Sequence, residues 1–230
     1  MKTIGLIGGM SWESTVLYYQ SINVQVKARC GGLHSAKILL HSFDFDEIER
    51  YQRLGEWGRA GEVLASAGRA LAQAGADFLV LCTNTMHKVA PQIEASCPIP
   101  LLHIADATAA SIKRAGIETV GLLGTQFTME QDFYVGRLRE KHGLNVLVPE
   151  PEARAGIHRI IYDELCLGVV EAPSRAFYRQ AIADLAGRGA QGIVFGCTEI
   201  TMLVGQGDSP VTVFDTTQIH AHAAVDLALS

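Results

Sequence analysis

Short apolar runs alternate along the first half of the chain with longer segments in which apolar residues recur at helical spacing. Each run is short enough for a buried strand, and each following segment has the periodicity of an amphipathic helix. The acidic stretch 44–49 opens one such segment, which is predicted to stay helical through Ala74 and to end at Gly75. Strand followed by helix, repeated, is the pattern of an α/β fold with a parallel sheet. The predicted strands of this half are 2–7, 36–41, 78–82 and 101–103.

The same pattern begins again near Gly116. Residues 120–125 resemble residues 4–9, with glycines at similar places among the apolar positions. Residues 189–198 align with residues 75–84 at an offset of 114 residues (189 − 75). An internal repeat of about half the chain predicts two similar α/β halves, each a small parallel sheet with crossover helices.

Two domains follow from this repeat. The first is expected over 1–115 and the second over 116–215, each a small sheet flanked by helices. Asp215 and the two threonines after it have the residue types of a helix N-cap, and the Ala-rich segment 216–230 is predicted to be a helix. Because the second domain is complete before this helix begins, we expect the helix to pack on the first domain.

Composition narrows the class of protein. With 48% hydrophobic and 19% charged residues, the 230-residue chain has the balance of a well-packed globular protein. Its net charge of −5 favours neither nucleic acid nor an anionic membrane surface as a partner. No apolar segment approaches the roughly 20 residues that span a bilayer. The N-terminus lacks a secretory signal pattern, and the cysteines form no C-x-x-C pattern, so a cytoplasmic location is expected. The cysteines are Cys30, Cys82, Cys97, Cys166 and Cys197.

Nucleotide and metal sites are not indicated. The opening G-L-I-G-G-M lacks the G-x-G-x-x-G spacing of a dinucleotide fingerprint. His220 and His222 are the one close histidine pair, and two residues apart on a helix they point to different sides, so no metal site is predicted. Three further histidines are interpreted as capping or packing residues: His41, His87 and His103.

Two strand ends carry the reactive side chains. The stretch Ile193–Glu199, I-V-F-G-C-T-E, is a buried strand that ends in a thiol, a hydroxyl and a carboxylate. The repeat aligns Cys197 with Thr83 and leaves Cys82 on the other face of its strand, as a buried thiol. Ligands bind at the carboxyl edge of an open α/β sheet. A helix that starts after each strand end would offer free N–H groups to a carboxylate and would lower the pKa of the Cys197 thiol.

Two interpretations of these strand ends stay open. Two groups that approach one carbon from opposite sides have the geometry of stereo-inversion, in which one removes the α-proton and the other supplies a proton to the opposite face. Alternatively, the polar residues 83–85 and 197–199 are ordinary N-caps in a small-ligand binding protein without catalysis.

Over essentially its whole length, the chain resembles the cofactor-independent aspartate/glutamate racemase family. The resemblance rests on G-L-I-G-G-M-S-W-E-S at 5–14, C-T-N-T-M-H at 82–87, I-Y-D-E-L at 161–165 and F-G-C-T-E-I at 195–200. Glu199, where glutamate racemases proper usually carry His, places the chain on the aspartate-racemase side. The resemblance implies two pseudo-symmetric flavodoxin/Rossmann-like α/β domains with the active site at their interface. It also implies an amino acid as the small-molecule partner, no cofactor, and a homodimer, which is common in the family.

The resemblance assigns roles position by position. Cys197 matches the second-domain catalytic cysteine, which deprotonates the L-enantiomer, and Thr83 stands where the first-domain cysteine is expected, as in a branch with a Thr/Cys pair. A threonine hydroxyl stays neutral near pH 7 and makes a poor base, so catalysis is expected to be lopsided. Among the implied substrate-binding residues, Asn84 and Thr85 match those that hold the α-carboxylate. The full set is Met10, Gln52, Asn84, Thr85, Cys166, Thr198 and Glu199.

Gln52 and Cys166 stand where family members that act on acidic amino acids hold the distal carboxylate with Arg and Lys. Without that Arg and Lys, charge-assisted binding of a second carboxylate is weaker. Nearby cations could compensate, and these are Arg50, Arg53, Lys88 and Arg159. The expected substrates are therefore aspartate and glutamate, or a wider set that includes neutral polar amino acids. Other enzymes of the same scaffold are alternatives: a maleate isomerase, a hydantoin racemase or an arylmalonate decarboxylase.

Overall fold

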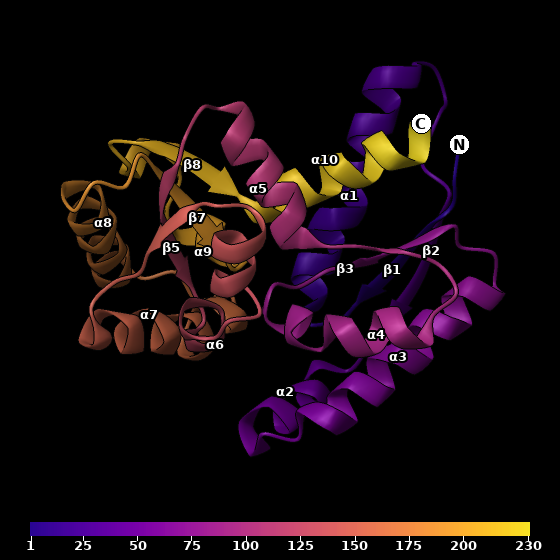
Figure 1. Cartoon of the computed structure of the whole chain (residues 1–230), viewed down its shortest axis with the longest axis horizontal. Helices are drawn as coiled ribbons and strands as arrows, with labels where there is room; N and C mark the ends of the chain where they lie inside the picture. Colours follow the sequence, from indigo (N-terminus) through magenta and orange to yellow (C-terminus); the bar gives the residue numbers. More distant parts are fainter. The chain divides into compact units, whose positions relative to one another are not determined.

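The computed structural model describes every residue from 1 to 230. The chain forms two compact units, the first made of residues 1–104 with 220–230 and the second of residues 105–219. Each unit contains a four-stranded sheet with helices on its faces (Figure 1). This confirms the α/β fold with two similar sheets that the repeat predicts.

In the first unit the strand order is β2-β1-β3-β4, and every neighbouring pair is parallel. Ile7 of the central strand pairs with His41 on one side and Leu81 on the other, so the carboxyl ends of three strands lie at one edge. The elements are β1 (Ile4–Gly8), α1 (Trp12–Cys30), β2 (Ile38–Ser42), α2 (Phe45–Leu54), α3 (Trp57–Gln73), β3 (Phe78–Leu81), the 3₁₀ helix η1 (Thr85–Val89), α4 (Ala90–Ser96) and β4 (Leu101–Leu102).

In the second unit the strand order is β6-β5-β7-β8. Both sheets therefore place the second strand of their half at one edge, followed by the first, third and fourth strands. The pairs of the second sheet are also parallel, with Gly124 of β5 opposite Gly196 of β7 at the carboxyl edge. The remaining elements are α5 (Ile104–Arg114), β5 (Thr119–Gly124), α6 (Gln126–Glu130), the π-helix η2 (Arg137–Lys141), β6 (Asn145–Leu147), α7 (Pro151–Asp163), the 3₁₀ helix η3 (Leu165–Leu167), α8 (Ala172–Gly187), β7 (Gly192–Gly196), α9 (Ile200–Leu203), the 3₁₀ helix η4 (Gln206–Asp208), β8 (Thr212–Asp215) and α10 (Thr216–Leu229).

The turn after β1 requires glycine. Gly9 has φ 86°, and a Cβ there would lie 2.3 Å from the backbone N and O of Phe43. Only a residue without a side chain lets this turn pass so close to the segment after β2. Ser11 then caps α1, because its hydroxyl accepts a hydrogen bond from the Ser14 N–H at 3.3 Å.

The single helix predicted from the acidic stretch to Ala74 is wrong, because two helices occupy this segment. α2 ends at Leu54, and Gly55 follows in the left-handed conformation with φ 70°. The Gly55 N–H donates to the Gln52 carbonyl at 3.2 Å, and the Glu56 N–H donates to the Tyr51 carbonyl at 2.9 Å. These bonds close a glycine C-cap, and α3 starts in a new direction.

The first sheet has a buried core on each face. Ile4 and Leu6 point to one face and Ile7 to the other, as alternation along a strand requires. α2, α3 and α4 cover the Ile7 face, whereas α1 and α10 cover the other. The α10 side chains in that second core are Ala221, Ala224, Val225 and Ala228.

The boundary between the units falls between Ile104 and Ala105, ahead of α5, rather than near Gly116. α5 is joined to its own unit through Asp106, whose carboxylate accepts two hydrogen bonds from Arg137, both at 2.7 Å, and one from Lys141 at 2.8 Å. His142 Nε2 lies 2.7 Å from the same carboxylate. Burial alone would raise the pKa of Asp106, but these partners hold that pKa well below its usual range.

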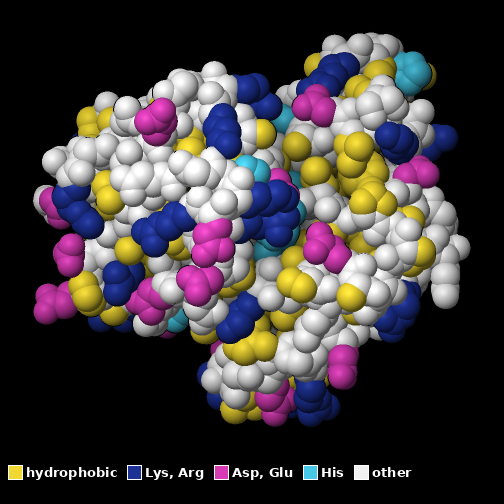
Figure 2. Space-filling view, in the orientation of Figure 1, with side chains coloured by type: hydrophobic (Ala, Val, Ile, Leu, Met, Phe, Trp, Pro, Cys, Tyr) yellow, Lys and Arg dark blue, Asp and Glu magenta, His cyan; other side chains and the backbone are white.

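Positive and negative side chains are interspersed over the face seen in Figure 2. That distribution agrees with a modest net charge of −5 and shows no large basic patch on this face. None of the helices combines the length and apolar character that crossing a bilayer requires. No group of three or more His, Cys, Asp or Glu side chains is arranged to hold a metal ion.

Candidate active site

Cys197 lies directly after β7, at the carboxyl edge of the second sheet. The strand can end so close to its neighbour because a Cβ at Gly196 would lie 3.1 Å from the Leu123 carbonyl oxygen, and glycine avoids this contact. The Cys197 side chain is buried, and its Sγ donates a hydrogen bond to Glu199 Oε2 at 2.9 Å. The thiol and the carboxylate that the sequence brings together are therefore one hydrogen-bonded pair.

The pKa of this thiol is raised, opposite to the lowering expected from the sequence. Burial is the main cause, and the negative charge of Glu199 adds to it, followed by Cys166. The expected helix dipole is weak here, because α9 after the strand end spans only Ile200–Leu203. In the folded protein Cys197 is therefore a protonated thiol that donates to a carboxylate.

Thr198 is buried beside the start of α10. Its Oγ1 accepts a hydrogen bond from Thr217 Oγ1 at 3.2 Å, and Thr216 Oγ1 donates to the Phe195 carbonyl at 2.8 Å. Asp215 caps the helix by accepting from the Thr217 N–H at 2.9 Å. Thr217 was not predicted as a site residue, although the cap-like D-T-T after the neighbouring strand β8 is a signal that could have located it.

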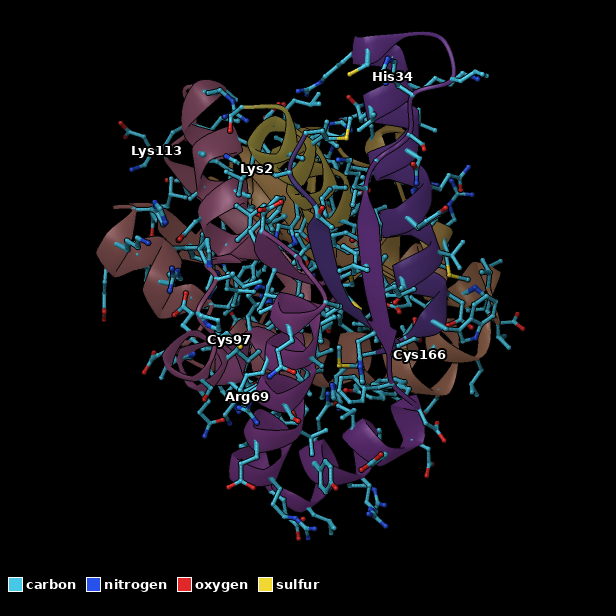
Figure 3. All side chains as sticks on the ribbon, turned by 90° about the vertical axis from the view of Figure 1, so that its right-hand side faces the viewer. Lys2, His34, Arg69, Cys97, Lys113 and Cys166 are labelled. Carbon is cyan, nitrogen blue, oxygen red and sulfur yellow. The ribbon has the colours of Figure 1, made fainter.

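Cys166, which Figure 3 labels, lies on η3 and is half-buried. Charges on Cys166 and Cys197 would both act on Tyr178, whose pKa is raised first by burial and then by these groups. The same influence of Cys166 reaches Cys197 itself. Cys166, Cys197 and Glu199 therefore share one environment in the second unit, in which added negative charge is unfavourable.

Thr83 occupies the matching place in the first unit, after the end of β3. Cys82 before it is fully buried, its Sγ contacts the Val80 carbonyl at 3.9 Å, and burial raises the pKa of its thiol. Thr83 is only half-buried. This agrees with the alignment of the repeat, which gives Cys82 a structural role and turns Thr83 toward the strand end.

Asn84 and Thr85 are buried, at 4% and 6% exposure. The helix predicted to start here is a 3₁₀ helix, η1, which continues into α4 only at Ala90. Its first turn is closed by the His87 N–H, which donates to the Asn84 carbonyl at 3.1 Å. The His87 ring turns back to the Thr83 carbonyl at 2.8 Å.

Met10 and Gln52 are both buried in the first unit. Gln52 is buried, and its Nε2 donates to the Met86 sulfur at 3.0 Å. Met10 and Met86 belong to the same buried cluster as Tyr51. At this position the protein therefore offers the amide of Gln52 and the thioether of Met86, neither of which carries a charge.

Most of the cations proposed as substitutes for the missing Arg and Lys are engaged elsewhere. Lys88 Nζ lies 3.9 Å from the centroid of the Trp57 ring, and burial lowers its pKa. Arg50 lies over the Tyr51 ring at 5.7 Å. Arg53 pairs with the preceding helical turn, 3.5 Å from the Glu49 carboxylate. These three are held by rings or a carboxylate of α2 and α3.

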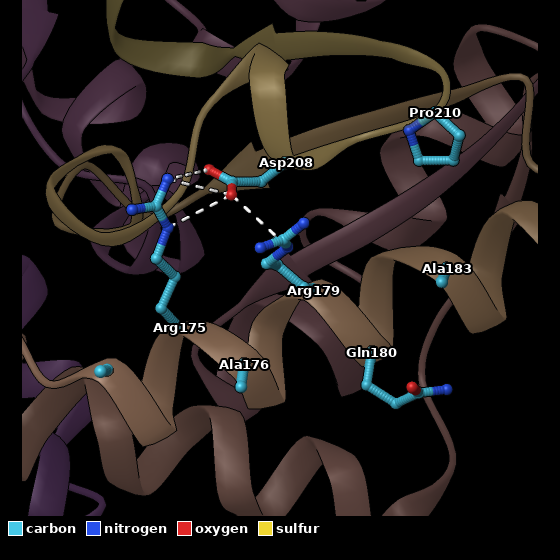
Figure 4. Close-up of a pocket in the computed structure, with 8 residues that line it drawn as sticks. Arg175, Ala176, Arg179, Gln180, Ala183, Asp208 and Pro210 are labelled. Atoms are coloured by element: carbon cyan, nitrogen blue, oxygen red, sulfur yellow. Dashed lines mark hydrogen bonds and ion pairs between the residues drawn. The ribbon is translucent and has the colours of Figure 1, made fainter.

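A separate hollow of about 700 Å³ lies along α8, away from all of these residues (Figure 4). Arg175 donates two hydrogen bonds to Asp208, at 3.2 and 3.0 Å, and Arg179 lies 3.6 Å from the same carboxylate. The hydrogen bond from Arg175 is the main reason that the pKa of Asp208 is lowered. The hollow contains none of the predicted site residues, and both of its arginines lie close to the one carboxylate, Asp208.

The predicted residues thus fall into two groups, each gathered at the carboxyl edge of its own sheet. The group of the first unit contains Met10, Gln52, Thr83, Asn84 and Thr85, and that of the second contains Cys166, Cys197, Thr198 and Glu199.

Solved structures of known proteins share this two-sheet fold. A crystal structure of a Yersinia pestis protein assigned as an Asp/Glu racemase is 60% identical, covers 100% of both chains and has a TM-score of 0.95. An aspartate racemase homologue from Pyrococcus horikoshii is 33% identical, also covers 100% of both chains, and has a TM-score of 0.85. Glutamate racemase from Francisella tularensis shares the fold, with 14% identity, a TM-score of 0.65, and coverage of 99% of this chain and 81% of that one.

The family model described as Asp/Glu/Hydantoin racemase matches residues 7–224, which include every residue of the two groups above. The match extends over both sheets and ends within α10. The chain therefore belongs to the Asp/Glu/hydantoin racemase family.

Proposed function

We propose that the protein is a cofactor-independent amino-acid racemase that inverts the α-carbon by two-base proton transfer. The observation that carries this proposal is the buried Cys197 thiol, which donates to the Glu199 carboxylate at the end of a central strand. A thiol paired with a proton acceptor can act as base and acid toward carbon. Membership of the racemase family favours inversion at carbon over other uses of such a pair.

Cys197 is the proposed base for the L-enantiomer. The resting thiol keeps its proton, because burial and the Glu199 charge raise its pKa. A bound amino-acid ammonium group would offset the negative charge and favour transfer of the thiol proton to Glu199. The thiolate then takes the α-proton, so that the thiol re-forms and the negative charge passes to the substrate carbanion.

Thr83 is the proposed group on the opposite face. Its hydroxyl donates a proton to the carbanion and takes a proton from water, while Glu199 returns to water the proton that it took from the thiol, so the inversion is complete and both residues regain their resting protonation. In the reverse direction a neutral hydroxyl is a weak base, because its oxygen does not ionise near pH 7. Removal of the α-proton from the D-enantiomer is therefore the slower half of the cycle.

The remaining residues are proposed to hold the amino acid. Asn84, Thr85 and Thr198 bring short polar side chains to the strand ends, which suits an α-carboxylate. Gln52, Cys166 and Met10 are proposed to meet the distal part of the substrate. Because none of them is a cation and Lys88 lies on an aromatic ring, we infer tolerance of neutral polar side chains besides aspartate and glutamate.

The test is a screen of common L-amino acids in deuterium oxide, read by loss of the α-proton signal in NMR. Protein treated to remove any carbonyl cofactor is expected to exchange at least one amino acid and to accumulate its D-enantiomer. Cys197→Ala is the matched control, and exchange that survives this substitution would refute the role of Cys197. Thr85→Val removes the hydroxyl at nearly constant side-chain volume and so tests carboxylate binding, and is expected to raise KM more than it lowers kcat.

Hydantoin racemisation is the second candidate, since the matching family includes hydantoin racemases. The same thiol could remove the acidic ring proton of a 5-substituted hydantoin. Incubation with chiral hydantoins separates the candidates: optical rotation that decays with hydantoins and not with amino acids would favour the second. Thermal stabilisation by an amino acid without any exchange would instead favour a binding protein.

A further inference from the structure

We propose that His87 is a positioning residue, which through its neutral Nδ1–H tautomer fixes the backbone that carries Thr83. The inference rests on the proposed function, because its effect is read in the half-reaction at Thr83. His87 itself is placed behind the strand end, away from the reacting atoms, and acts only through the Thr83 backbone. Its role was not evident in the sequence, where it was interpreted as a capping or packing residue.

The two ring nitrogens of His87 have partners of opposite kind. His87 Nδ1 lies 2.8 Å from the Thr83 carbonyl oxygen, and the Ile104 backbone N–H donates to Nε2 at 3.2 Å. A carbonyl can only accept and a backbone amide can only donate, so Nδ1 must carry the proton and Nε2 the lone pair. One tautomer satisfies both bonds, and a second proton on the ring would meet the Ile104 N–H. The ring is 1% exposed, so water does not compete for either nitrogen.

Thr83 depends on this bond because it lies beyond the sheet. The last ladder bond of this strand end is donated by the Cys82 N–H to the Ile7 carbonyl at 2.9 Å. The Thr83 N–H turns back to the Leu81 carbonyl at 2.9 Å, and its own carbonyl is held by the imidazole. A threonine side chain has few χ1 choices, so fixing its backbone also directs its hydroxyl.

The His87 ring is itself held by packing. Its centroid lies 4.5 Å from that of His103 and 5.9 Å from that of His220. His220 is fixed in turn, since its two nitrogens lie 2.8 Å from the Tyr18 hydroxyl and 2.8 Å from the Leu102 carbonyl. The support for Thr83 therefore reaches into the core of the first unit.

The second unit lacks this device, so the fold alone does not require it. At the offset of 114 residues, the position that aligns with His87 is Thr201. Thr201 is exposed, and its hydroxyl donates to the carbonyl of Thr198 in its own turn at 2.8 Å. The supporting imidazole is therefore present behind Thr83 and absent behind Cys197.

Two amide substitutions separate the two bonds of His87. In His87→Asn the side-chain amide nitrogen lies as many bonds from Cα as Nδ1 does, so it can still donate to the Thr83 carbonyl. In His87→Gln the terminal amide lies where Nε2 does, so it can accept from Ile104 but cannot reach Thr83 in the same way. Both variants lose the ring, and both are expected to lower thermal stability by similar amounts.

The readout is α-deuterium exchange of each enantiomer in deuterium oxide, with folding checked by circular dichroism. We expect His87→Gln to slow exchange of the D-enantiomer by about 10- to 100-fold, as displacement of a reacting group does, and to leave exchange of the L-enantiomer nearly unchanged. His87→Asn is expected to retain most of the D-exchange. Equal losses for both enantiomers in both variants, or no loss in His87→Gln, would overturn the positioning role.

The tautomer provides a test that needs no turnover. ¹⁵N NMR of histidine-labelled protein, assigned with His87→Gln, is expected to show a protonated Nδ1 and an unprotonated Nε2 for His87. A proton on Nε2 in the folded protein would overturn the inference even if the enzyme is a racemase. If the wild-type protein exchanges no amino acid, the proposed function fails and the role in turnover fails with it. If it exchanges but the amide variants do not differ, only the inference on His87 fails.

Discussion

The two strand ends that the repeat makes equivalent are built by different means. After β7, Cys197 is buried, and its thiol donates a hydrogen bond to the carboxylate of Glu199. After β3, Thr83 is half-buried, and the bond that defines its position is made by its backbone to His87. The scaffold thus fixes where the two residues are, whereas the neighbouring side chains decide what each can do. One end holds a protonated thiol beside a proton acceptor, and the other holds a neutral hydroxyl in place.

The same contrast appears in the charges that support each unit. In the first unit, buried neutral imidazoles stabilise the region behind the strand end, and burial lowers the pKa of His220 to about 4. In the second unit, α5 is attached by the charged partners of Asp106. The first arrangement is sensitive to added protons near neutral pH, and the second only where carboxylates are protonated.

The largest expected effect comes from removing the thiol. Cys197→Ala should slow α-proton exchange of the L-enantiomer by about 10³-fold or more, because it deletes the general base. Cys82→Ala is the matched control, since that thiol is fully buried against the Val80 carbonyl and its loss should cost stability and little activity. Comparable exchange rates in the two variants would contradict the assignment of Cys197 as the catalytic thiol and Cys82 as the structural one.

The second effect concerns acid. The folded pKa of His220, about 4, is below the unfolded value of 6.5, so the unfolded chain binds a proton first as the pH falls. The contribution of neutral His220 to the free energy of unfolding is therefore fully present above pH 6.5. It is lost between pH 6.5 and 4, by up to roughly 3 kcal/mol. Urea unfolding at pH 7.5 and 5 checks this, with His220→Gln as a non-titrating control. If the control loses as much stability on acidification as the wild-type protein, the assignment to His220 fails.

The third effect makes the two strand ends alike. Thr83→Cys replaces a neutral hydroxyl with a thiol that can ionise, and roughly tenfold faster inversion is expected. Because the two enantiomers are equally stable, kcat/KM must rise equally in both directions. Thr83→Ser is the control, since it keeps the hydroxyl chemistry and should gain nothing. A cysteine variant no faster than wild type would count against Thr83 facing the α-carbon.

The smallest effect separates the causes that act on Cys197. Glu199→Gln removes the negative charge beside the thiol, so the pKa of Cys197 should fall, although burial keeps it above its ordinary value. The pH dependence of iodoacetamide alkylation, with other thiols followed by mass spectrometry, measures the change. An unchanged profile would mean that burial alone sets the pKa, and that Glu199 is no acceptor for the thiol proton.

Much of the scaffold could be predicted from the sequence. Apolar runs located β1 to β5 and β7 to within a few residues but did not predict β6 and β8, and the offset between residues 75–84 and 189–198 gave the two matching sheets. The alternation of side chains at the end of this strand was enough to predict that Cys82 is buried, and Thr83 after it is more exposed. These features depend on local periodicity, which a single sequence carries.

The chemistry of the site could not be predicted in the same way. The direction of the shift in the pKa of Cys197 depends on burial and on the length of α9. The residue types at a helix N-cap do not reveal whether the helix that follows has four residues or many more. The role of His87 depends on the backbone N–H of Ile104, which is distant in sequence. Lys88 was a candidate for substrate binding until its position over the Trp57 ring was known.

The central claim is that Cys197 is an effective acid–base group while Thr83 is a weak one. It is tested most directly by deuterium exchange without inversion, measured for each enantiomer with the wild-type protein. The account predicts that the L-enantiomer exchanges its α-proton about tenfold or more faster than it is inverted, and that the D-enantiomer shows no such excess. Equal excess exchange for both enantiomers, or faster exchange of the D-enantiomer, would contradict it.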